Sequence, residues 1–144
     1  MNLMQKMLSI LFFATATATA QTAAPITTTD TRAVLELLRG NVDMYGVNFG
    51  SLDFQRGILQ LAQQRAIKIR VMTAPSVAQN FKPLKSVGAG VFTLPAKFTN
   101  AMIVVQGGPV IIPTKTNYQI VTDPKNTAAM TGLLTQYWQI AKSY

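Results

Sequence analysis

Hydrophobic and polar positions along the chain change between the spacing of strands and the spacing of helices. In residues 67–73, IKIRVMT, apolar side chains occupy alternate positions with Lys68 and Arg70 between them, which predicts a strand. The apolar runs at 101–106 and 109–113 flank a Gly-Gly pair, which predicts a hairpin. Shorter apolar runs predict further strands at 42–49, within 86–94 and at 118–122.

Two segments early in the chain place apolar residues at the spacing of an amphipathic helix. The first begins at Asp30 or Thr31, which are residue types that cap a helix N-terminus, and Gly40 closes it. The second begins after Ser51, and its apolar residues recur every three or four positions. We therefore expect one helix on each side of the strand at 42–49.

The last part of the chain predicts a long helix. Asp123 followed by Pro124 gives the usual order of a capping residue and a first helical residue. An apolar stripe follows, of a kind that is typical of core packing rather than of a ligand site. Its members are Met130, Leu133, Leu134, Tyr137, Trp138 and Ala141. A shorter helix is expected within residues 73–85, where Pro83 would end it.

The order of these elements predicts the class of fold. A helix, a strand, a second helix and a second strand are followed by a run of strands and a closing helix, which is typical of a layered α/β domain. We expect this domain to occupy residues 30–144. Residues 21–29 are rich in Thr and Ala without apolar periodicity, so we expect a flexible leader there.

The first twenty residues have the pattern of a secretory signal peptide. Lys6 precedes an apolar stretch at 7–14, and residues 18–20, Ala-Thr-Ala, have the small residues that signal peptidase accepts. The apolar stretch is too short to span a bilayer, and no later segment is a candidate span. We expect export to the periplasm or the exterior, with cleavage before Gln21; an uncleaved anchor remains the alternative.

Composition removes several kinds of chemistry. The chain has no His and no Cys, so the usual zinc sites and the common nucleophile–base pairs cannot form. We expect no metal site and no cofactor, and the chain offers little for hydrolytic chemistry. The five carboxylates are scattered along the chain, at Asp30, Glu36, Asp43, Asp53 and Asp123.

The charge of the chain points to a class of partner. Lys and Arg number 13 against 5 acidic residues, a formal net charge of +8. Such an excess suits a polyanion, such as nucleic acid, an anionic membrane surface or a cell-wall polymer. The alternative is that the positive charge only keeps an exported protein soluble.

From about Asp30 to Tyr144 the chain resembles the phospholipase D superfamily, and in particular its small, single-repeat, exported bacterial endonucleases. Residues 42–76 are similar to the family's first two strands with the helix between them. Residues 84–114 resemble the catalytic strand with its hairpin, and 117–144 resemble the closing strand and Trp-bearing helix. The resemblance implies a phospholipase D-like single repeat, which is an α-β-α sandwich around a mixed central sheet.

The catalytic motif of that family is His-x-Lys-x4-Asp, in which the His is the nucleophile and the Lys holds phosphate oxygens. On this sequence the motif falls on Thr99, Ala101 and Gln106, so all three residues are replaced. A Thr hydroxyl needs a base to activate it, and the chain has no His to serve as one. The resemblance therefore implies the fold without the family's catalysis, and we do not expect an enzyme.

The resemblance also identifies candidate residues for phosphate binding. The family's Gly-Ser-x-Asn element is replaced here by residues 113–116, Pro-Thr-Lys-Thr. Hydroxyl, amide and ammonium groups near the two strand ends imply a remnant of the phosphate pocket, although these residues also suit ordinary loops. The candidate ligand-binding residues are Lys97, Asn100, Thr114, Lys115 and Thr116.

A complete site in this family uses two copies of the fold, so a single copy implies a homodimer. The leading hypothesis is an exported, catalytically inactive module that binds nucleic acid or another phosphate-bearing polyanion. Further basic candidates for such binding are Lys68, Arg70, Lys82 and Lys85. The alternatives are a structural subunit with a protein partner in an envelope assembly, and a nuclease or phosphodiesterase that retains activity.

Overall fold

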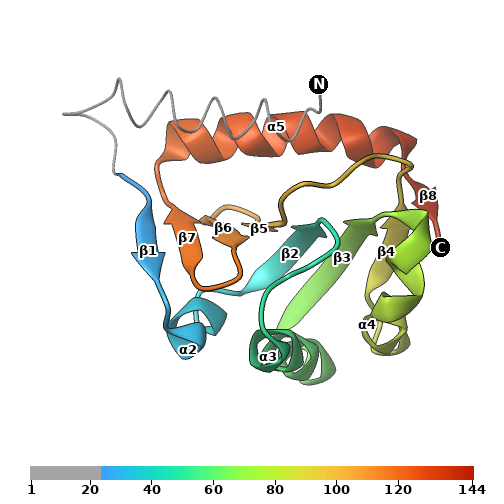
Figure 1. Ribbon diagram of the computed structural model, residues 1–144, viewed down its shortest axis with the longest axis horizontal. Helices are drawn as coiled ribbons and strands as arrows, with labels where there is room; N and C mark the ends of the chain where they lie inside the picture. Colours follow the sequence, from blue (N-terminus) through green and yellow to red (C-terminus); the bar gives the residue numbers. More distant parts are fainter. Residues whose placement is uncertain (1–23) are drawn as a thin grey trace.

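The computed structural model describes residues 24–144, so the expected signal peptide lies outside the described residues. Within them, a mixed sheet of eight strands lies between two layers of helices. Helix α5 covers one face of the sheet, and helices α2, α3 and α4 lie on the other face (Figure 1). The expected α/β sandwich with a mixed central sheet is confirmed.

The strands run in the order β1-β7-β6-β5-β2-β3-β4-β8 across the sheet. Strands β2, β3 and β4 pair in parallel, and the other neighbouring pairs are antiparallel. Consequently the carboxyl ends of β2 and β6 and the amino end of β5 meet at one edge. The bounds are β1 Ile26–Thr28, β2 Gly40–Tyr45, β3 Ile67–Thr73, β4 Gly90–Thr93, β5 Met102–Val105, β6 Val110–Pro113, β7 Tyr118–Val121 and β8 Lys142–Ser143.

The helices begin where the sequence places capping residues. Asp30, Ser51 and Asp123 each accept a hydrogen bond from a backbone N–H of the first helical turn. Pro124 occupies the first turn of the last helix, where its missing N–H is tolerated. The bounds are α2 Thr31–Leu35, α3 Leu52–Gln63, the 3₁₀ segment η1 Pro75–Phe81, α4 Lys82–Ser86 and α5 Pro124–Ile140.

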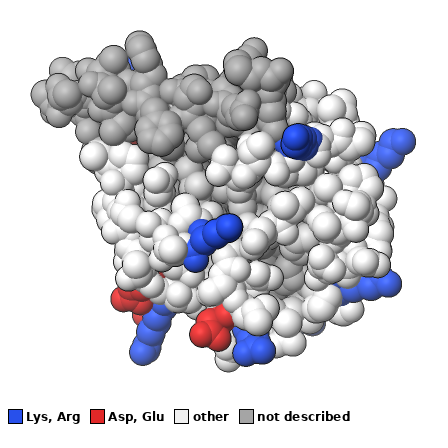
Figure 2. All heavy atoms as spheres, viewed as in Figure 1, with Lys and Arg blue, Asp and Glu red and all other residues white. Residues whose placement is uncertain are grey.

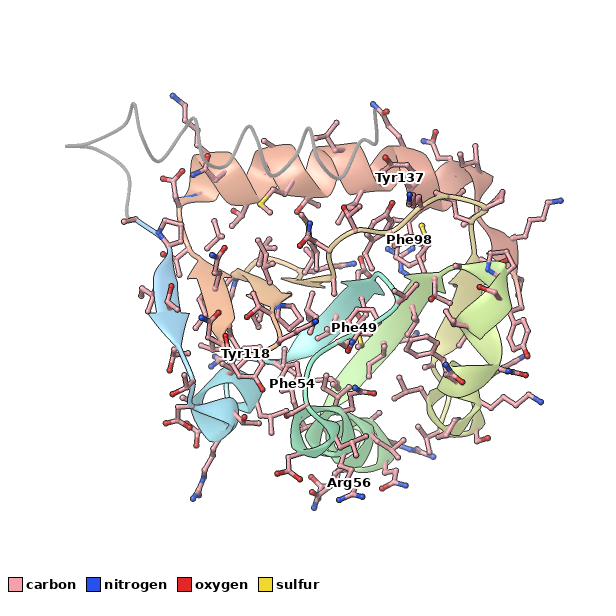
Figure 3. The ribbon with its side chains drawn as sticks, viewed as in Figure 1. Phe49, Phe54, Arg56, Phe98, Tyr118 and Tyr137 are labelled. Carbon is pink, nitrogen blue, oxygen red and sulfur yellow. The ribbon has the colours of Figure 1, made fainter. Side chains whose placement is uncertain are left out.

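The sheet divides the hydrophobic core into two clusters. The larger lies against α2, α3 and α4, where Phe49 and Phe54 are buried, and Figure 3 shows both on that side of the sheet. The smaller lies under α5 and includes Tyr45 and Tyr137. Phe98, from the connection between β4 and β5, packs against this second cluster. Removing these side chains from water is the main force that holds the layers together.

The first of the described residues differ from the sequence-based expectation. A flexible leader over 21–29 is wrong for Ile26–Thr28, which form β1 and pair antiparallel with β7. Three consecutive residues give no periodicity, but Ile and Thr are β-branched and fit a pleated edge. The described part of the leader therefore extends the sheet.

Two other boundaries move for local reasons. The first helix ends at Leu35 rather than running to Gly40, because the following N–H groups of Leu37 and Leu38 bond three residues back in a tighter turn. Gly40 has a φ of +63° and opens β2, so the strand expected at 42–49 spans Gly40–Tyr45 instead. A glycine suits this position because few side chains adopt positive φ.

The region around Pro83 also differs from the expected single helix at 73–85. A 3₁₀ segment comes first, and Pro83 then lies in the first turn of α4, where proline is tolerated, instead of ending a helix. Strand β8 at Lys142–Ser143 was not expected at all; it pairs with β4 through residues 92 and 93. Among residues 24–144, no helix combines the length and apolarity required to cross a bilayer.

Candidate functional site

A cavity of about 490 Å³ opens at the edge where β2 and β6 end and β5 begins. Its walls come from the connection after β2, the residues just before β5 and the turn after β6. The lining residues are Asn48, Gly50, Ser51, Thr99, Asn100, Ala101, Pro113, Thr114 and Lys115. The cavity therefore combines hydroxyl, amide and ammonium groups and contains no carboxylate.

A close backbone contact lies next to Ala101, one of the lining residues of this cavity. Gly46 follows β2 with a φ of +140°, and a Cβ built on it would lie 2.8 Å from Cα of Ala101. Only a glycine fits there, because such a distance is shorter than any real Cβ contact. Ala101 itself is 5% exposed. The end of β2 and the start of β5 are thus held together without any side chain between them.

The connection after β2 delivers the N-terminus of α3 to the rim of the cavity. Ser51 Oγ accepts from the N–H of Phe54 at 3.2 Å, and Asn48 Oδ1 accepts from the N–H of Gly50 at 3.2 Å. The positive end of the helix dipole therefore faces the same rim. Asp53 in the first turn opposes an incoming anion in part, and its carboxylate is 4.0 Å from Nη1 of Arg56.

The turn between β6 and β7 presents Lys115. Thr114 Oγ1 accepts hydrogen bonds from the N–H groups of Thr116 and Asn117, at 3.3 and 3.0 Å. The same hydroxyl donates to the carbonyl oxygen of Asn117 at 3.0 Å. These bonds are a local side-chain to backbone arrangement that fixes the turn. The hydroxyl of Thr114 thus shapes the rim, and the exposed Lys115 lies at its tip.

The structure brings most of the candidate residues into one place. Thr99, Ala101, Asn100, Thr114 and Lys115 all line the cavity. Three candidates are not among its lining residues: Lys97 and Thr116, which are exposed, and Gln106. Sequence reasoning missed Asn48 as a lining residue and recognised Ser51 only as a helix cap. The Asn-x-Gly-Ser order after a strand was the available signal for both.

Gln106 lies at the far end of β5, away from the cavity. Its Nε2 donates to Oδ2 of Asp43 at 3.2 Å. Asp43 also accepts from Nε and Nη2 of Arg70, both at 2.8 Å, in a bidentate ion pair. The guanidinium carbon of Arg70 lies 4.1 Å from the ring centre of Trp138 on α5. We call Gln106, Asp43, Arg70 and Trp138 the Asp43 network.

The Asp43 network changes what its members can bind. The hydrogen bonds to Asp43 raise the pKa of Arg70 above its ordinary value, so the guanidinium stays charged. Its charge is already matched by the buried carboxylate of Asp43. Arg70, a basic candidate from the sequence, is therefore committed to the fold and to α5 rather than to a ligand.

Aromatic rings pack together under α5, next to the segment that leads to Thr99. Tyr45, the last residue of β2, lies with its ring centre 5.0 Å from that of Phe98 and 5.3 Å from that of Tyr137. Figure 3 shows Phe98 and Tyr137 together on this side of the sheet. Burial raises the pKa of Tyr45 well above its usual value of 10.0, and the nearby Tyr137 adds to the rise. A neutral ring stack thus anchors the segment that leads to Thr99.

Residues 24–144 contain no group of three His, Cys, Asp or Glu side chains placed to hold a metal ion. The side-chain carboxylates are all engaged, as three pair with Arg and Asp30 and Asp123 cap helices. Setting aside Lys6, the chain retains 12 of its 13 Lys and Arg against 5 acidic residues. On the face shown in Figure 2 the basic side chains are spread apart rather than gathered in one patch.

The fold is similar to solved structures at low sequence identity. TrmBL2, an archaeal chromatin protein whose structure shows a novel mode of DNA binding, matches with a TM-score of 0.62 and 14% identity over 97% of this chain and 62% of that chain. Nuc from Salmonella typhimurium, a phospholipase D family member, matches with a TM-score of 0.59 and 14% identity over 83% of this chain and 98% of that chain.

NucT from Helicobacter pylori matches with a TM-score of 0.58 and 12% identity over 79% of this chain and 88% of that chain. No protein-family model and no curated protein matches the sequence. The chain spans 62% of the length of TrmBL2, which is less than two thirds. These likenesses show a phospholipase D-like fold and confirm the fold that the sequence resemblance implied.

Proposed function

We propose that this protein is an exported, catalytically inactive phospholipase D-like module that binds a phosphate-bearing polyanion, with nucleic acid as the principal partner. The observation that carries the proposal is the cavity at the sheet edge. Thr99 and Ala101 stand there in place of a nucleophile and a phosphate clamp, while Asn100, Ser51 and Lys115 remain around them.

The chemistry of the cavity supports binding without turnover. Thr99 Oγ1 accepts a hydrogen bond from Asn100 Nδ2 at 3.4 Å, and an amide N–H₂ cannot remove the proton of the hydroxyl. Neither a His nor a Cys exists anywhere in the chain to replace the missing nucleophile. Ala101 offers no positive charge to a transferring phosphoryl group. Hydrogen bonding and attraction of an anion to Lys115 remain possible at the same place.

Charge supports a polyanion rather than a single small ligand. On the face shown in Figure 2 the basic side chains are spread apart, which suits contacts with successive phosphates along a polymer. TrmBL2, described as a chromatin protein with a mode of DNA binding, has a similar fold and fits this class of partner. Affinity from such contacts falls steeply with salt because bound phosphates release counterions.

A mobility shift of duplex DNA at rising salt tests the proposal. The wild-type domain is expected to bind at low salt and to lose affinity by more than about tenfold between 50 and 200 mM salt. Lys115→Ala should weaken binding, whereas Arg32→Ala removes an equal charge from an exposed pair with Glu36 and serves as the control. Binding that ignores salt, or no binding at low salt, contradicts the proposal.

Turnover and export need separate measurements. The purified protein should not hydrolyse DNA or a small phosphodiester substrate, either with or without added divalent metal. Turnover that survives further purification, and disappears in Thr99→Val, would instead favour the enzyme. Export rests on residues 1–20, so fractionation of cells expressing the full chain should place the protein outside the cytoplasm, cleaved before Gln21.

Exposed apolar side chains beside the cavity favour a protein interface as well. Val47 and Leu52 are 39% and 68% exposed and lie on the connection and helix that form the rim. A homodimer formed through this surface would place two cavities side by side, and an envelope partner is the alternative occupant. Size-exclusion chromatography with light scattering tests the homodimer. A dimer that Leu52→Glu separates into monomers supports it, and a stable wild-type monomer contradicts it.

A further inference from the structure

A second cavity, of about 530 Å³, opens at the opposite edge of the sheet from the first. It lies where β2 and β3 begin and is closed by the residues just before β4, so Gly40, Asn41 and Gly88 are among its lining residues. No acidic side chain lines it. We call this surface the amino edge, because the parallel strands β2 and β3 start there.

Basic side chains concentrate at the amino edge. Arg65 and Lys68 line the cavity, and Arg39 directly precedes Gly40, the partner of Ile67 in the parallel register. All three side chains are exposed. None of them forms an ion pair with a carboxylate of residues 24–144. Two positive charges thus line the hollow, and a third lies on the residue just before it, without a carboxylate partner among residues 24–144.

Arg65 occupies a backbone conformation that favours glycine. Its φ is +60°, and it is the sole non-glycine residue with positive φ among residues 24–144. The N–H of Ala66 bonds to the carbonyl of Leu61 at 2.9 Å, which is the pattern of a Schellman helix end. A side chain here is less favourable than glycine, because its Cβ crowds the backbone at positive φ. The negative end of the helix dipole favours a cation here. Because that end carries only about half a charge, it does not neutralise the guanidinium of Arg65.

We propose that the amino edge is a second polyanion-binding surface, which contacts phosphodiester groups through Arg65, Lys68 and Arg39. This inference rests on the proposed function of the first cavity. Strand β2 has six residues and separates the two edges by roughly 20 Å at 3.3 Å per residue. One molecule therefore contacts two separate stretches of nucleic acid and bridges them.

The backbone of Arg65 provides an unusually clean test. Arg65→Gly removes the charge and also relieves the positive φ, so the variant should be at least as stable as the wild type. Lys68→Gln removes a second charge and keeps most of the side-chain length. The matched control is Arg32→Gln with Lys125→Gln, which removes two charges from exposed side chains that line neither cavity. Thermal unfolding of each variant verifies that the fold is intact.

Duplex DNA on beads, loaded with protein, is then offered a second, labelled duplex at low salt. Wild type and control are expected to retain the second duplex, whereas R65G/K68Q should bind the first duplex and retain about tenfold less of the second. A homodimer carrying two copies of the first cavity would also bridge, but it would be insensitive to R65G/K68Q.

Equal retention by R65G/K68Q and the control therefore overturns the second surface. Binding of the first duplex by wild type without retention of the second overturns it as well. Failure of wild type to bind even the bead-bound duplex is a distinct result, because it removes the proposed function together with this inference.

Discussion

Strand β5 joins two regions that differ in what surrounds the side chains at its two ends. At its start, Thr99 and Ala101 line an open cavity, where Thr99 accepts one hydrogen bond from Asn100 and Ala101 packs into the core. At its end, Gln106 donates to Asp43, which also holds Arg70 in a bidentate pair. One end of the strand thus borders open space, and the other end is held by an internal polar network.

The two ends also differ in the forces that hold them. The Asp43 network depends on charge, since a buried carboxylate is stable only while its cation and hydrogen-bond donors are present. The cavity end depends on neutral rings, because Tyr45, Phe98 and Tyr137 pack beneath the connection to Thr99. Substitutions and pH should therefore affect the two ends separately.

Breaking the ion pair should give the largest effect. Arg70→Ala leaves the Asp43 carboxylate, whose side chain is 11% exposed, with the amide of Gln106 as its remaining side-chain donor. We expect the free energy of unfolding to fall by about 3 kcal/mol. Urea denaturation measures it, and Arg32→Ala, in an exposed pair, should change it by less than about 1 kcal/mol. If both variants lower the free energy of unfolding by the same amount, the Asp43 network stabilises the fold no more than an exposed ion pair does.

A carboxylate at position 106, where the sequence resemblance would place one, should destabilise the protein. Gln106→Asp replaces a donor 3.2 Å from Oδ2 of Asp43 with a second carboxylate, so we expect a loss of about 2 kcal/mol at neutral pH. The loss should shrink below about pH 4, where protonation removes the repulsion. Gln106→Ala, which only loses the hydrogen bond, should cost about 1 kcal/mol. A Gln106→Asp variant as stable as wild type contradicts this account.

Alkaline pH should loosen the cavity end. The pKa of Tyr45 is raised above 10.0 in the folded state, so its contribution is complete below pH 10 and declines as pH rises further and the unfolded chain ionises. Stability should fall by about 1.4 kcal/mol per pH unit from this side chain. Denaturation curves at several pH values measure it, and Tyr45→Phe should give a shallower decline. Parallel curves for the two proteins would refute the assignment.

The smallest effect is expected inside the cavity. Thr99 is exposed and its hydroxyl makes one weak contact, at 3.4 Å to Asn100. Thr99→Ala should therefore change the free energy of unfolding by less than about 0.5 kcal/mol. The same urea titration used for Arg70→Ala checks this. A loss comparable to that of Gln106→Ala would mean that both ends of β5 hold the fold, and the contrast would disappear.

Elements whose cause is local were predictable from the sequence. The strand at 67–73 and the helices that start after Ser51 and Asp123 follow from alternation, spacing and capping, and the structure reproduces them. Strands β1 and β8 were missed because they comprise three and two residues and exist only through pairing with β7 and β4. Such pairing is a tertiary effect that no local pattern contains.

The site divides in the same way. The family resemblance directed attention to Thr99, Ala101 and Lys115, and the structure gathers them at one cavity. It gave no means to foresee that Gln106 would bond to Asp43, because that contact joins residues 63 positions apart. The glycine-like backbone of Arg65 was equally hidden, since an Arg after a helix looks like an ordinary charged C-terminus.

The short outer strands have a consequence for solubility. A sheet edge with unpaired N–H and C=O groups is a template on which further chains assemble into fibres. Here β1 offers three residues and β8 offers two, and Ile26, Lys142 and Ser143 are exposed. An incoming strand would find too few backbone groups to bind at either border. The two edge strands of the sheet are thus its shortest strands, and this limits the growth of fibres from a protein in which 49% of the residues are hydrophobic.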